Sequence, residues 1–203
     1  MATPSTTEAP AYEAVILAGG QGSRMGHVEK GLQAWRGQPL FRHAQALLAR
    51  QSPPPQRIWL NANRHGDTYA LGALTVLPDC RAGFAGPLAG MEAGLQVCTQ
   101  PWLLCIPCDM PLLPADLAAT LFAAVTGGAP AAYAIAAGRA QPVCCLLQRD
   151  LLASLTATLD QGHGKVLGWL GTVGAVPATF DDARPFTNFN TLAELQGSSE
   201  STP

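Results

Sequence analysis

Residues 14–31, AVILAGGQGSRMGHVEKG, place glycines and two basic side chains behind a short apolar run. Glycines leave consecutive backbone N–H groups accessible, and such groups bind phosphate oxygens. Cationic side chains beside them stabilise the charge that develops on a leaving pyrophosphate. The segment therefore predicts a nucleotide phosphate site, and the alternative is a glycine-rich turn with solvated basic residues. The residues concerned are Gly19, Gly20, Gly22, Gly26, Arg24 and Lys30.

Two common nucleotide motifs do not fit this loop. A Walker A loop needs G-x-x-x-x-G-K-[ST], but here His27 follows the last glycine, and Gly31 follows Lys30. A dinucleotide fingerprint needs a third glycine where Met25 stands, and an acidic residue about 20 positions later that this chain lacks. The sequence indicates a longer phosphate loop in which glycine N–H groups and both cations act together.

Asp109 lies between two prolines in PCDMP, at the end of an apolar run. Magnesium bound to nucleotide phosphates takes one or two carboxylates and keeps several waters. Asp109 is therefore well placed to be a magnesium ligand. The alternative is a helix cap for the following PADL segment, although Asp116 inside that segment lessens the need for one.

Asn61 and Asn63 lie two residues apart in LNANR, so that on a strand both face the same side. Asp79 follows the next apolar run. A carboxylate can accept hydrogen bonds from N1–H and the exocyclic amine of guanine, a pattern that adenine does not offer. Asp79 and Asn61 are thus predicted to recognise guanine, and the alternative is an asparagine cap beside a turn aspartate. Gly86 and Gly90 in GFAGPLAGM are predicted to border the base or ribose, or simply to begin a helix.

Cys105 and Cys108 form a C-x-x-C sequence, which suits a redox pair or half of a zinc site. No second C-x-x-C is present, and the adjacent Cys144 and Cys145 would point to opposite faces of a strand. Cys105 also lies inside an apolar run and not at a helix start. We interpret these cysteines as small buried residues.

The elements that must position these residues alternate along the chain. Continuous apolar runs predict buried strands, and apolar spacing of three and four predicts helices. We expect a three-layer α/β/α sandwich with a mostly parallel, Rossmann-like sheet, in which the loops after the strands gather at one edge. The expected strands are 13–19, 57–63, 73–79, 101–111, 131–138 and 142–149, and the expected helices are 39–51, 86–98, 114–125, 150–160 and a last one from 191.

The 203 residues and 48% hydrophobic content suit one domain, expected over residues 14–196, with flexible termini at 1–13 and 197–203. Residues 1–65 hold seven basic against three acidic side chains, net +4, which favours an anionic small ligand. The chain has no dense basic run, which argues against a nucleic-acid partner. It also has no apolar run long enough to cross a membrane. The absence of an export signal leads us to expect a cytoplasmic protein with reduced thiols.

The segments LAGGQGSRMGHVEKGL, NANR, GPLAGM, PCDMP and the late NFN, in this order, resemble the molybdenum cofactor guanylyltransferases. These belong to the nucleotidyltransferase superfamily, whose fold is that of the nucleotide-diphospho-sugar transferases. The resemblance runs from about Ala14 to Leu195. It implies an enzyme that transfers GMP from GTP to molybdopterin, forming the guanine dinucleotide cofactor and pyrophosphate.

The resemblance also implies roles for individual residues. Arg24, Lys30 and Asp109 would be catalytic, with Asp109 holding Mg²⁺, and Asn188 and Asn190 would meet the pterin. The residues expected to contact GTP are Leu17, Ala18, Gly19, Gly20, Lys30, Asn61, Asp79, Gly86, Gly90 and Asp109.

Two other functions share these features. One is a cytidylyl or sugar-nucleotide transferase on the same fold, and the other is a non-catalytic GTP-binding protein that delivers the cofactor. We expect a monomer whose partners are GTP and molybdopterin, with transient contacts to cofactor-biosynthesis or apo-molybdoenzyme proteins.

Overall fold

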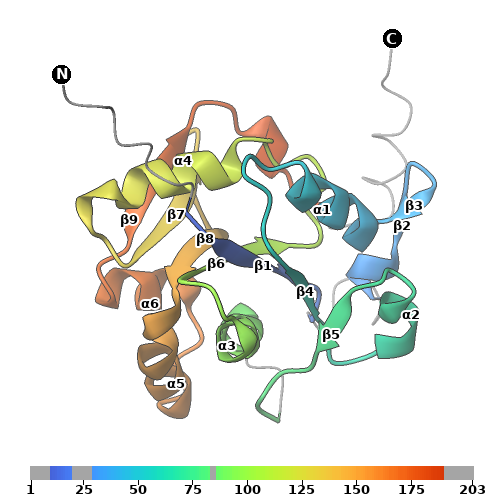
Figure 1. Cartoon of the computed structure of the whole chain (residues 1–203), viewed down its shortest axis with the longest axis horizontal. Helices are drawn as coiled ribbons and strands as arrows, with labels where there is room; N and C mark the ends of the chain where they lie inside the picture. The colour runs from blue at the N-terminus through green and yellow to red at the C-terminus, as the bar shows by residue number, and fades with distance from the viewer. Residues whose placement is uncertain (1–9, 20–28, 83–85, 190–203) are drawn as a thin grey trace, which may run out of the picture.

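The computed structural model describes residues 10–19, 29–82 and 86–189 (Figure 1). Within them a seven-stranded sheet has the order β5-β4-β1-β6-β8-β7-β9. Neighbours pair in parallel except on the two sides of β8, which runs against β6 and β7. The strands are β1 (Tyr12–Leu17), β4 (Ile58–Asn61), β5 (Thr75–Leu77), β6 (Trp102–Pro107), β7 (Ala131–Ala136), β8 (Arg139–Gln148) and β9 (Val176–Phe180).

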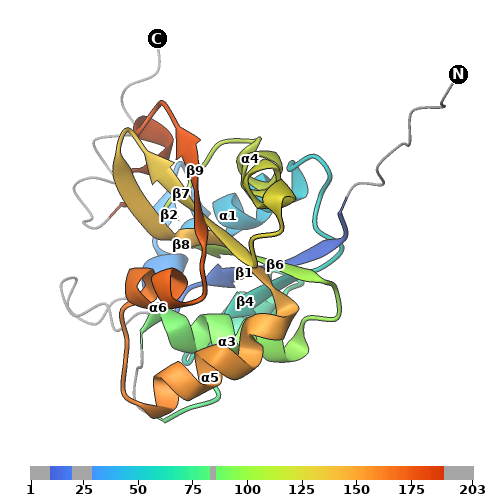
Figure 2. The same cartoon turned by 90° about the vertical axis from the view of Figure 1, so that its left-hand side faces the viewer.

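Helices cover both faces of the sheet. Figures 1 and 2 show α1 and α4 over one face and α3, α5 and α6 over the other. The predicted three-layer sandwich with a mostly parallel sheet is confirmed. The helices are α1 (Leu40–Ala49), α2 (Gly66–Ala70), α3 (Pro87–Val97), α4 (Leu117–Ala124), α5 (Leu152–Asp160) and α6 (Val166–Thr172), with short 3₁₀ turns at Lys30–Leu32, Val125–Gly127, Arg149–Leu151 and Arg184–Phe186.

Strand β1 is buried along its whole length, as its continuous apolar run predicts. Its alternate residues enter two different cores, because successive side chains of a strand point to opposite faces. Ile16 packs with α1 and α4, whereas Val15 and Leu17 pack with α3. The strand starts at Tyr12, two residues before the expected domain boundary, because Tyr12 is buried in the first core and the Glu13 carboxylate accepts from Trp59 Nε1 (2.6 Å).

The structure contains several elements that the sequence did not predict. Strand β9 reads VPATF, and its proline argues against a strand except at a sheet edge, which is where it lies. The hairpin of β2 (Ala34–Trp35) and β3 (Gln38–Pro39) and the helices α2 and α6 are too short for a clear periodic pattern. The last expected helix, from 191, lies outside the described residues. Within the described ranges, no helix has the length and apolar character that spanning a membrane requires.

The interpretation of the C-x-x-C cysteines as buried residues is confirmed. Cys105 and Cys108 are both buried free thiols, and burial raises the pKa of each above its ordinary value. Cys144 and Cys145 enter opposite cores, as their adjacency in a strand predicts. The Cys105 and Cys108 thiols therefore stay protonated and shielded from solvent.

Thiol titration tests this arrangement directly. Cys80 is exposed, whereas the other five cysteines are buried. We expect Ellman's reagent to modify one thiol per native chain at neutral pH and six in denaturant, because only a solvent-accessible thiolate reacts. A Cys80→Ser variant should show no fast-reacting thiol in the native state. Rapid modification of two or more thiols in the folded wild type would contradict the packing of these strands.

Candidate functional site

Three parallel strand pairs end at the same level of the sheet. Leu17 at the end of β1 pairs with Asn61 of β4 on one side and with Pro107 of β6 on the other. Asn61 in turn pairs with Leu77 of β5. The predicted meeting of the loops that follow these strands is thereby confirmed for their described parts, and in α/β sheets this edge is where ligands bind.

Lys30 and Asp109 form an ion pair at this edge. Lys30 Nζ donates to Asp109 Oδ2 (3.0 Å), and the side chains are 27% and 14% exposed. Lys30 opens a 3₁₀ turn, and Asp109 follows β6. The alternative role of Asp109 as a helix cap does not hold, because α4 begins at Leu117 and Asp116 stands at its N-cap position. The pair combines a cation and a carboxylate that remain accessible to a ligand.

Asn61, Asn63 and Asp79 form a hydrogen-bonded cluster at the ends of β4 and β5. Asn61 Nδ2 donates to Asp79 Oδ1 (2.9 Å), and Asn63 Nδ2 donates to Asp79 Oδ2 (2.7 Å). The backbone N–H of Asp79 donates back to Asn63 Oδ1 (2.7 Å). The two amides therefore fix the Asp79 carboxylate from both sides. An ionised carboxylate has about four lone-pair sites, so each oxygen can accept a further bond.

Gly90 has a packing role beside this cluster. It is buried in α3, and a Cβ there would collide with the Asn61 side chain and with Leu17. Only glycine lets the helix approach the ends of β1 and β4 this closely. Gly86 differs, because it is exposed, precedes α3 and has φ +75°, a conformation that favours glycine. The alternative that these glycines begin a helix is thus confirmed for Gly86.

Leu17, Ala18 and Gly19 lead from β1 into the site. The Ala18 N–H donates to the Asn61 carbonyl (2.9 Å), and the Leu17 carbonyl accepts from the Cys108 N–H (3.1 Å). A Cβ on Gly19 would lie 3.1 Å from Asn61 Oδ1. The backbone at these residues is therefore fixed to both neighbouring strands.

Arg81 holds the loop after Asp79 to the helices below the sheet. Its guanidinium donates from Nε and Nη2 to both Glu92 carboxylate oxygens (2.7 and 2.8 Å) and from Nη1 to Asp160 (2.6 Å). Glu92 is 1% exposed and also accepts from Thr156 Oγ1 (2.8 Å). The bonds from Arg81 lower the pKa of Glu92, so that it remains a carboxylate. These bonds hold the loop that follows Asp79 and so limit where Asp79 can lie.

The segment that contains the predicted pterin residues reaches the same edge. The Phe189 N–H donates to the backbone carbonyl of Asp109 (2.9 Å), and the Phe189 ring packs on Trp35. Asn188, next to it, is exposed. Five of the predicted site residues, Gly20, Gly22, Arg24, Gly26 and Asn190, lie outside the described residues.

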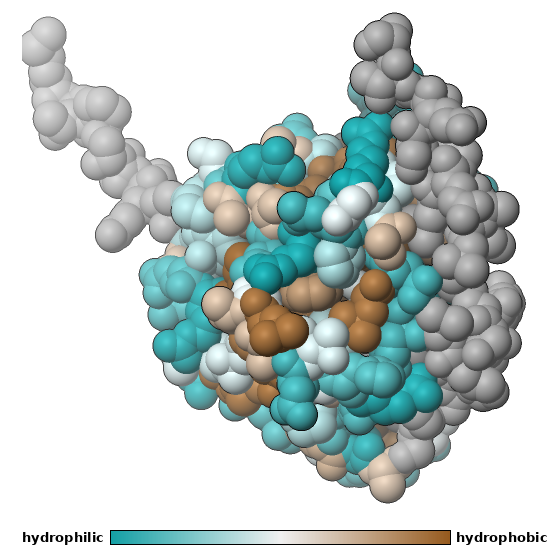
Figure 3. All heavy atoms as spheres, turned by 90° about the vertical axis from the view of Figure 1, so that its right-hand side faces the viewer, coloured by the Kyte–Doolittle hydropathy of each residue, from teal (hydrophilic) through white to brown (hydrophobic). Residues whose placement is uncertain are grey.

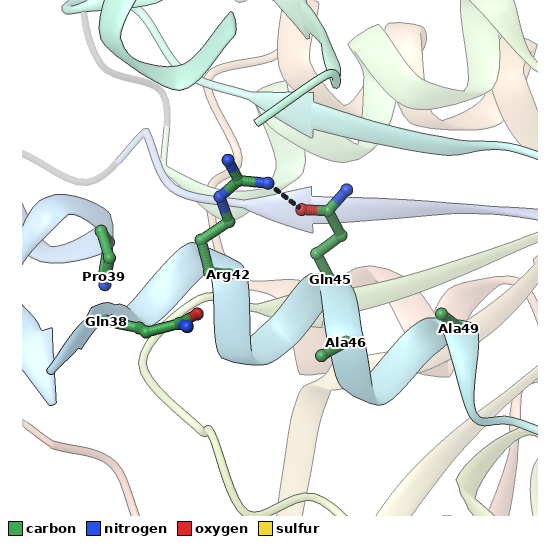
Figure 4. Close-up of a pocket in the computed structure, with 6 residues that line it drawn as sticks. All are labelled: Gln38, Pro39, Arg42, Gln45, Ala46 and Ala49. Carbon is green, nitrogen blue, oxygen red and sulfur yellow. Dashed lines mark hydrogen bonds between the residues drawn. The ribbon is translucent and has the colours of Figure 1, made fainter. Parts of the chain in front are cut away.

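A separate surface hollow lies along the outer face of α1 (Figure 4). Arg42 in it donates to Gln45 Oε1 (3.3 Å) and to the Leu71 carbonyl (2.8 Å). None of the residues predicted to bind nucleotide lines it. In the surface view of Figure 3, hydrophobic residues form small separate groups among hydrophilic ones. The residues that line the hollow are Gln38, Pro39, Arg42, Gln45, Ala46 and Ala49.

Comparison with known proteins gives a family match. The sequence model of the MobA-like NTP transferase domain matches residues 14–173. The chain belongs to the MobA-like NTP transferase family. The family match covers every described residue predicted to bind the nucleotide. Members of known name include a molybdenum cofactor guanylyltransferase of Ralstonia nicotianae, 45% identical over 90% of this chain and 93% of its own. Another, from Bordetella petrii, is 44% identical over 90% of this chain and 94% of its own.

Solved structures share the fold of this MobA-like chain. The molybdopterin-guanine dinucleotide biosynthesis protein A of Archaeoglobus fulgidus superposes with a TM-score of 0.73 at 21% identity, over 93% of this chain and 97% of its own. A 4-diphosphocytidyl-2C-methyl-D-erythritol synthase of Anaerococcus prevotii also gives 0.73, at 9% identity, over 94% and 95%. At these identities the likeness shows the fold alone.

Sequence reasoning missed the partners of Glu29. Arg64 Nε lies 2.8 Å from Glu29 Oε1, and the Tyr69 hydroxyl lies 3.5 Å from Oε2. Glu29 directly precedes Lys30, and Arg64 directly follows Asn63. The available signal was that Glu29 adjoins Lys30, a predicted site residue, and that Arg64 belongs to the NANR segment. The 34 residues between Glu29 and Arg64 left no local pattern that could pair them.

Proposed function

We propose that this protein transfers GMP from GTP to the phosphate of molybdopterin and releases pyrophosphate. The product is the guanine dinucleotide form of the cofactor. The observation that carries the proposal is the 45% identity to a molybdenum cofactor guanylyltransferase over nine-tenths of both chains. The Lys30–Asp109 pair and the Asp79 cluster, which lie at the ligand-binding edge of the sheet, support it.

In the proposed reaction a phosphate oxygen of molybdopterin attacks the α-phosphorus of GTP. A new P–O–P bond forms, the bond from the α-phosphorus to the bridging oxygen breaks, and pyrophosphate leaves with that electron pair. No general base is needed, because a phosphate monoester is largely ionised near neutral pH. Catalysis then consists of positioning and charge stabilisation. Lys30 stabilises negative charge on the triphosphate, and Arg24 is proposed to do the same.

Guanine recognition is proposed for Asp79. Its oxygens each accept one amide bond and can each accept one more, from N1–H and from the exocyclic amine of guanine. Asn61 uses both of its amide hydrogens, toward Asp79 and the Leu77 carbonyl (3.1 Å). Its proposed contribution to GTP binding is therefore to orient Asp79 and to offer its own carbonyl oxygen. Gly90 leaves the space that this amide occupies.

The donor set fits a magnesium ion that arrives with the nucleotide. Asp109 supplies one carboxylate at the strand end, and in the described part of the chain no group of three His, Cys, Asp or Glu side chains forms a closed metal cage. Mg²⁺ in nucleotide sites uses one or two carboxylates, substrate phosphates and water. Asp109 would hold the ion, which would supply positive charge to stabilise the triphosphate. Lys30, now paired with Asp109, would turn to the phosphates.

The acceptor is proposed to lie on the Phe189 side of Asp109. Asn188 is exposed there, and amide groups suit a pterin because they both donate and accept. Asn190 is the second proposed pterin residue. We further propose a cytoplasmic monomer that meets cofactor-biosynthesis or apo-molybdoenzyme proteins transiently.

A nucleotide panel tests the proposed function. The enzyme is mixed with molybdopterin, magnesium and one nucleoside triphosphate at a time, and pyrophosphate release is measured. Release with GTP alone is expected. Release with CTP would indicate a cytidylyl transferase instead. No release with any triphosphate, together with tight GTP binding, would indicate a GTP-binding delivery protein.

A further inference from the structure

Glu29 anchors the residue before Lys30. Its side chain is 7% exposed and accepts from Arg64 Nε at 2.8 Å. Its second oxygen accepts from the Tyr69 hydroxyl at 3.5 Å. Burial raises the pKa of Tyr69, which keeps the hydroxyl protonated and able to donate. A carboxylate held from two sides fixes the backbone at which the Lys30 side chain begins.

Gly31 anchors the residue after Lys30. It is buried, and a Cβ on it would lie 2.5 Å from the Tyr69 hydroxyl oxygen. Tyr69 is fully buried and packs edge-on against Phe41. The backbone on both sides of Lys30 therefore rests on the same tyrosine, and Lys30 is left to reach Asp109.

The partners of both anchors come from the segment that follows β4. Arg64 is the residue after Asn63, whose amide binds the Asp79 carboxylate. Tyr69 lies in α2, which begins two residues later at Gly66. One short segment thus contacts the guanine-side cluster at its start and, toward its end, the two residues that flank Lys30.

We infer that Arg64, Glu29 and Tyr69 are positioning residues that hold Lys30 in place from the segment that recognises the base. This inference rests on the proposed roles of Lys30 and Asp79. A displacement of reacting groups by about 1 Å can cost about 100-fold in rate. Loosening these anchors is therefore expected to lower turnover while base recognition at Asp79 persists.

The main test uses the double variant Glu29→Gln with Arg64→Gln. Removing Arg64 alone leaves the Glu29 carboxylate buried without its ion-pair partner and can unfold a protein, whereas the double variant removes both charges of the pair. We expect kcat for pyrophosphate release to fall about 10- to 100-fold. Binding of tripolyphosphate, which has no base, should weaken at least about fivefold, and guanosine, which has no phosphate, should bind within about twofold of wild type. Tyr69→Phe should show the same pattern with a smaller loss.

Two control variants make the outcomes distinguishable. Arg50→Gln removes an exposed arginine of the α1 end and should match wild type. Lys30→Ala should itself abolish turnover. If it does not, the result contradicts the proposed role of Lys30 and leaves the anchoring by Glu29, Arg64 and Tyr69 as a separate question. If Lys30→Ala is inactive but the folded double variant keeps wild-type kcat, the inference is overturned. It is also overturned if guanosine binding weakens as much as tripolyphosphate binding, or if activity loss follows the unfolding temperature alone.

Discussion

Asp109→Asn should reduce pyrophosphate release from Mg-GTP by at least about 100- to 1,000-fold. Losses of this size follow removal of a single group that stabilises developing charge. The substitution keeps the shape of the side chain but removes the carboxylate proposed to hold magnesium. Its cost in folding should be at most about 1 kcal/mol, because only a partly exposed ion pair with Lys30 is lost. Steady-state kinetics and thermal unfolding together measure both effects.

Asp116→Asn is the matched control for this prediction. Asp116 is exposed, precedes α4 and makes no side-chain cap bond, so its variant should keep wild-type turnover. Raising the magnesium concentration should recover part of the Asp109→Asn activity, since an amide oxygen is a weaker ligand than a carboxylate. A folded Asp109→Asn enzyme with near-normal turnover would overturn the metal assignment.

Asp79→Asn should remove the preference for guanine. A site built to hydrogen-bond a substrate group rejects an analogue that lacks it by large factors, up to about 10⁴. The wild type should therefore use GTP far better than ITP, which lacks the exocyclic amine. In the variant, kcat/KM for GTP should fall about 1,000-fold, and the GTP-to-ITP ratio should approach one. The ratio separates base recognition from a general loss of activity.

The matched control for Asp79→Asn is Asp150→Asn, at an exposed aspartate of the 3₁₀ turn before α5. It should keep both kcat/KM and the nucleotide ratio. A folded Asp79→Asn variant that still discriminates GTP from ITP as the wild type does would move guanine recognition to other residues.

The fold could be predicted where the pattern is long and continuous. The runs around Val15 and Cys105 are apolar throughout, and this identified buried strands of a covered sheet. Strand β9 could not be found this way, because its Pro177 is compatible with a strand only at an edge, and only the sheet order makes it an edge. Short elements such as α2 depend on tertiary contacts and not on their own periodicity.

Some features of the candidate site could also be predicted from the sequence, and others could not. Strand-end residues such as Asp79 and Asp109 could be placed together in advance, because parallel strands bring their carboxyl ends to one edge. The need for glycine at position 90 could not be predicted, because it arises from the packing of α3 against the Asn61 side chain. The pairing of Glu29 with Arg64 likewise depends on how two loops fold over each other, which no local spacing records.

The hydrogen bond from the Phe189 N–H to the Asp109 carbonyl bears on the order in which the parts of the site assemble during synthesis. Asp109 leaves the ribosome after β1, β4 and β5, and the base-side cluster of Asn61 and Asp79 precedes it. Phe189 follows only when synthesis is almost complete. A nascent chain can therefore assemble its nucleotide side first, while the contact between Asp109 and the acceptor-side segment forms last.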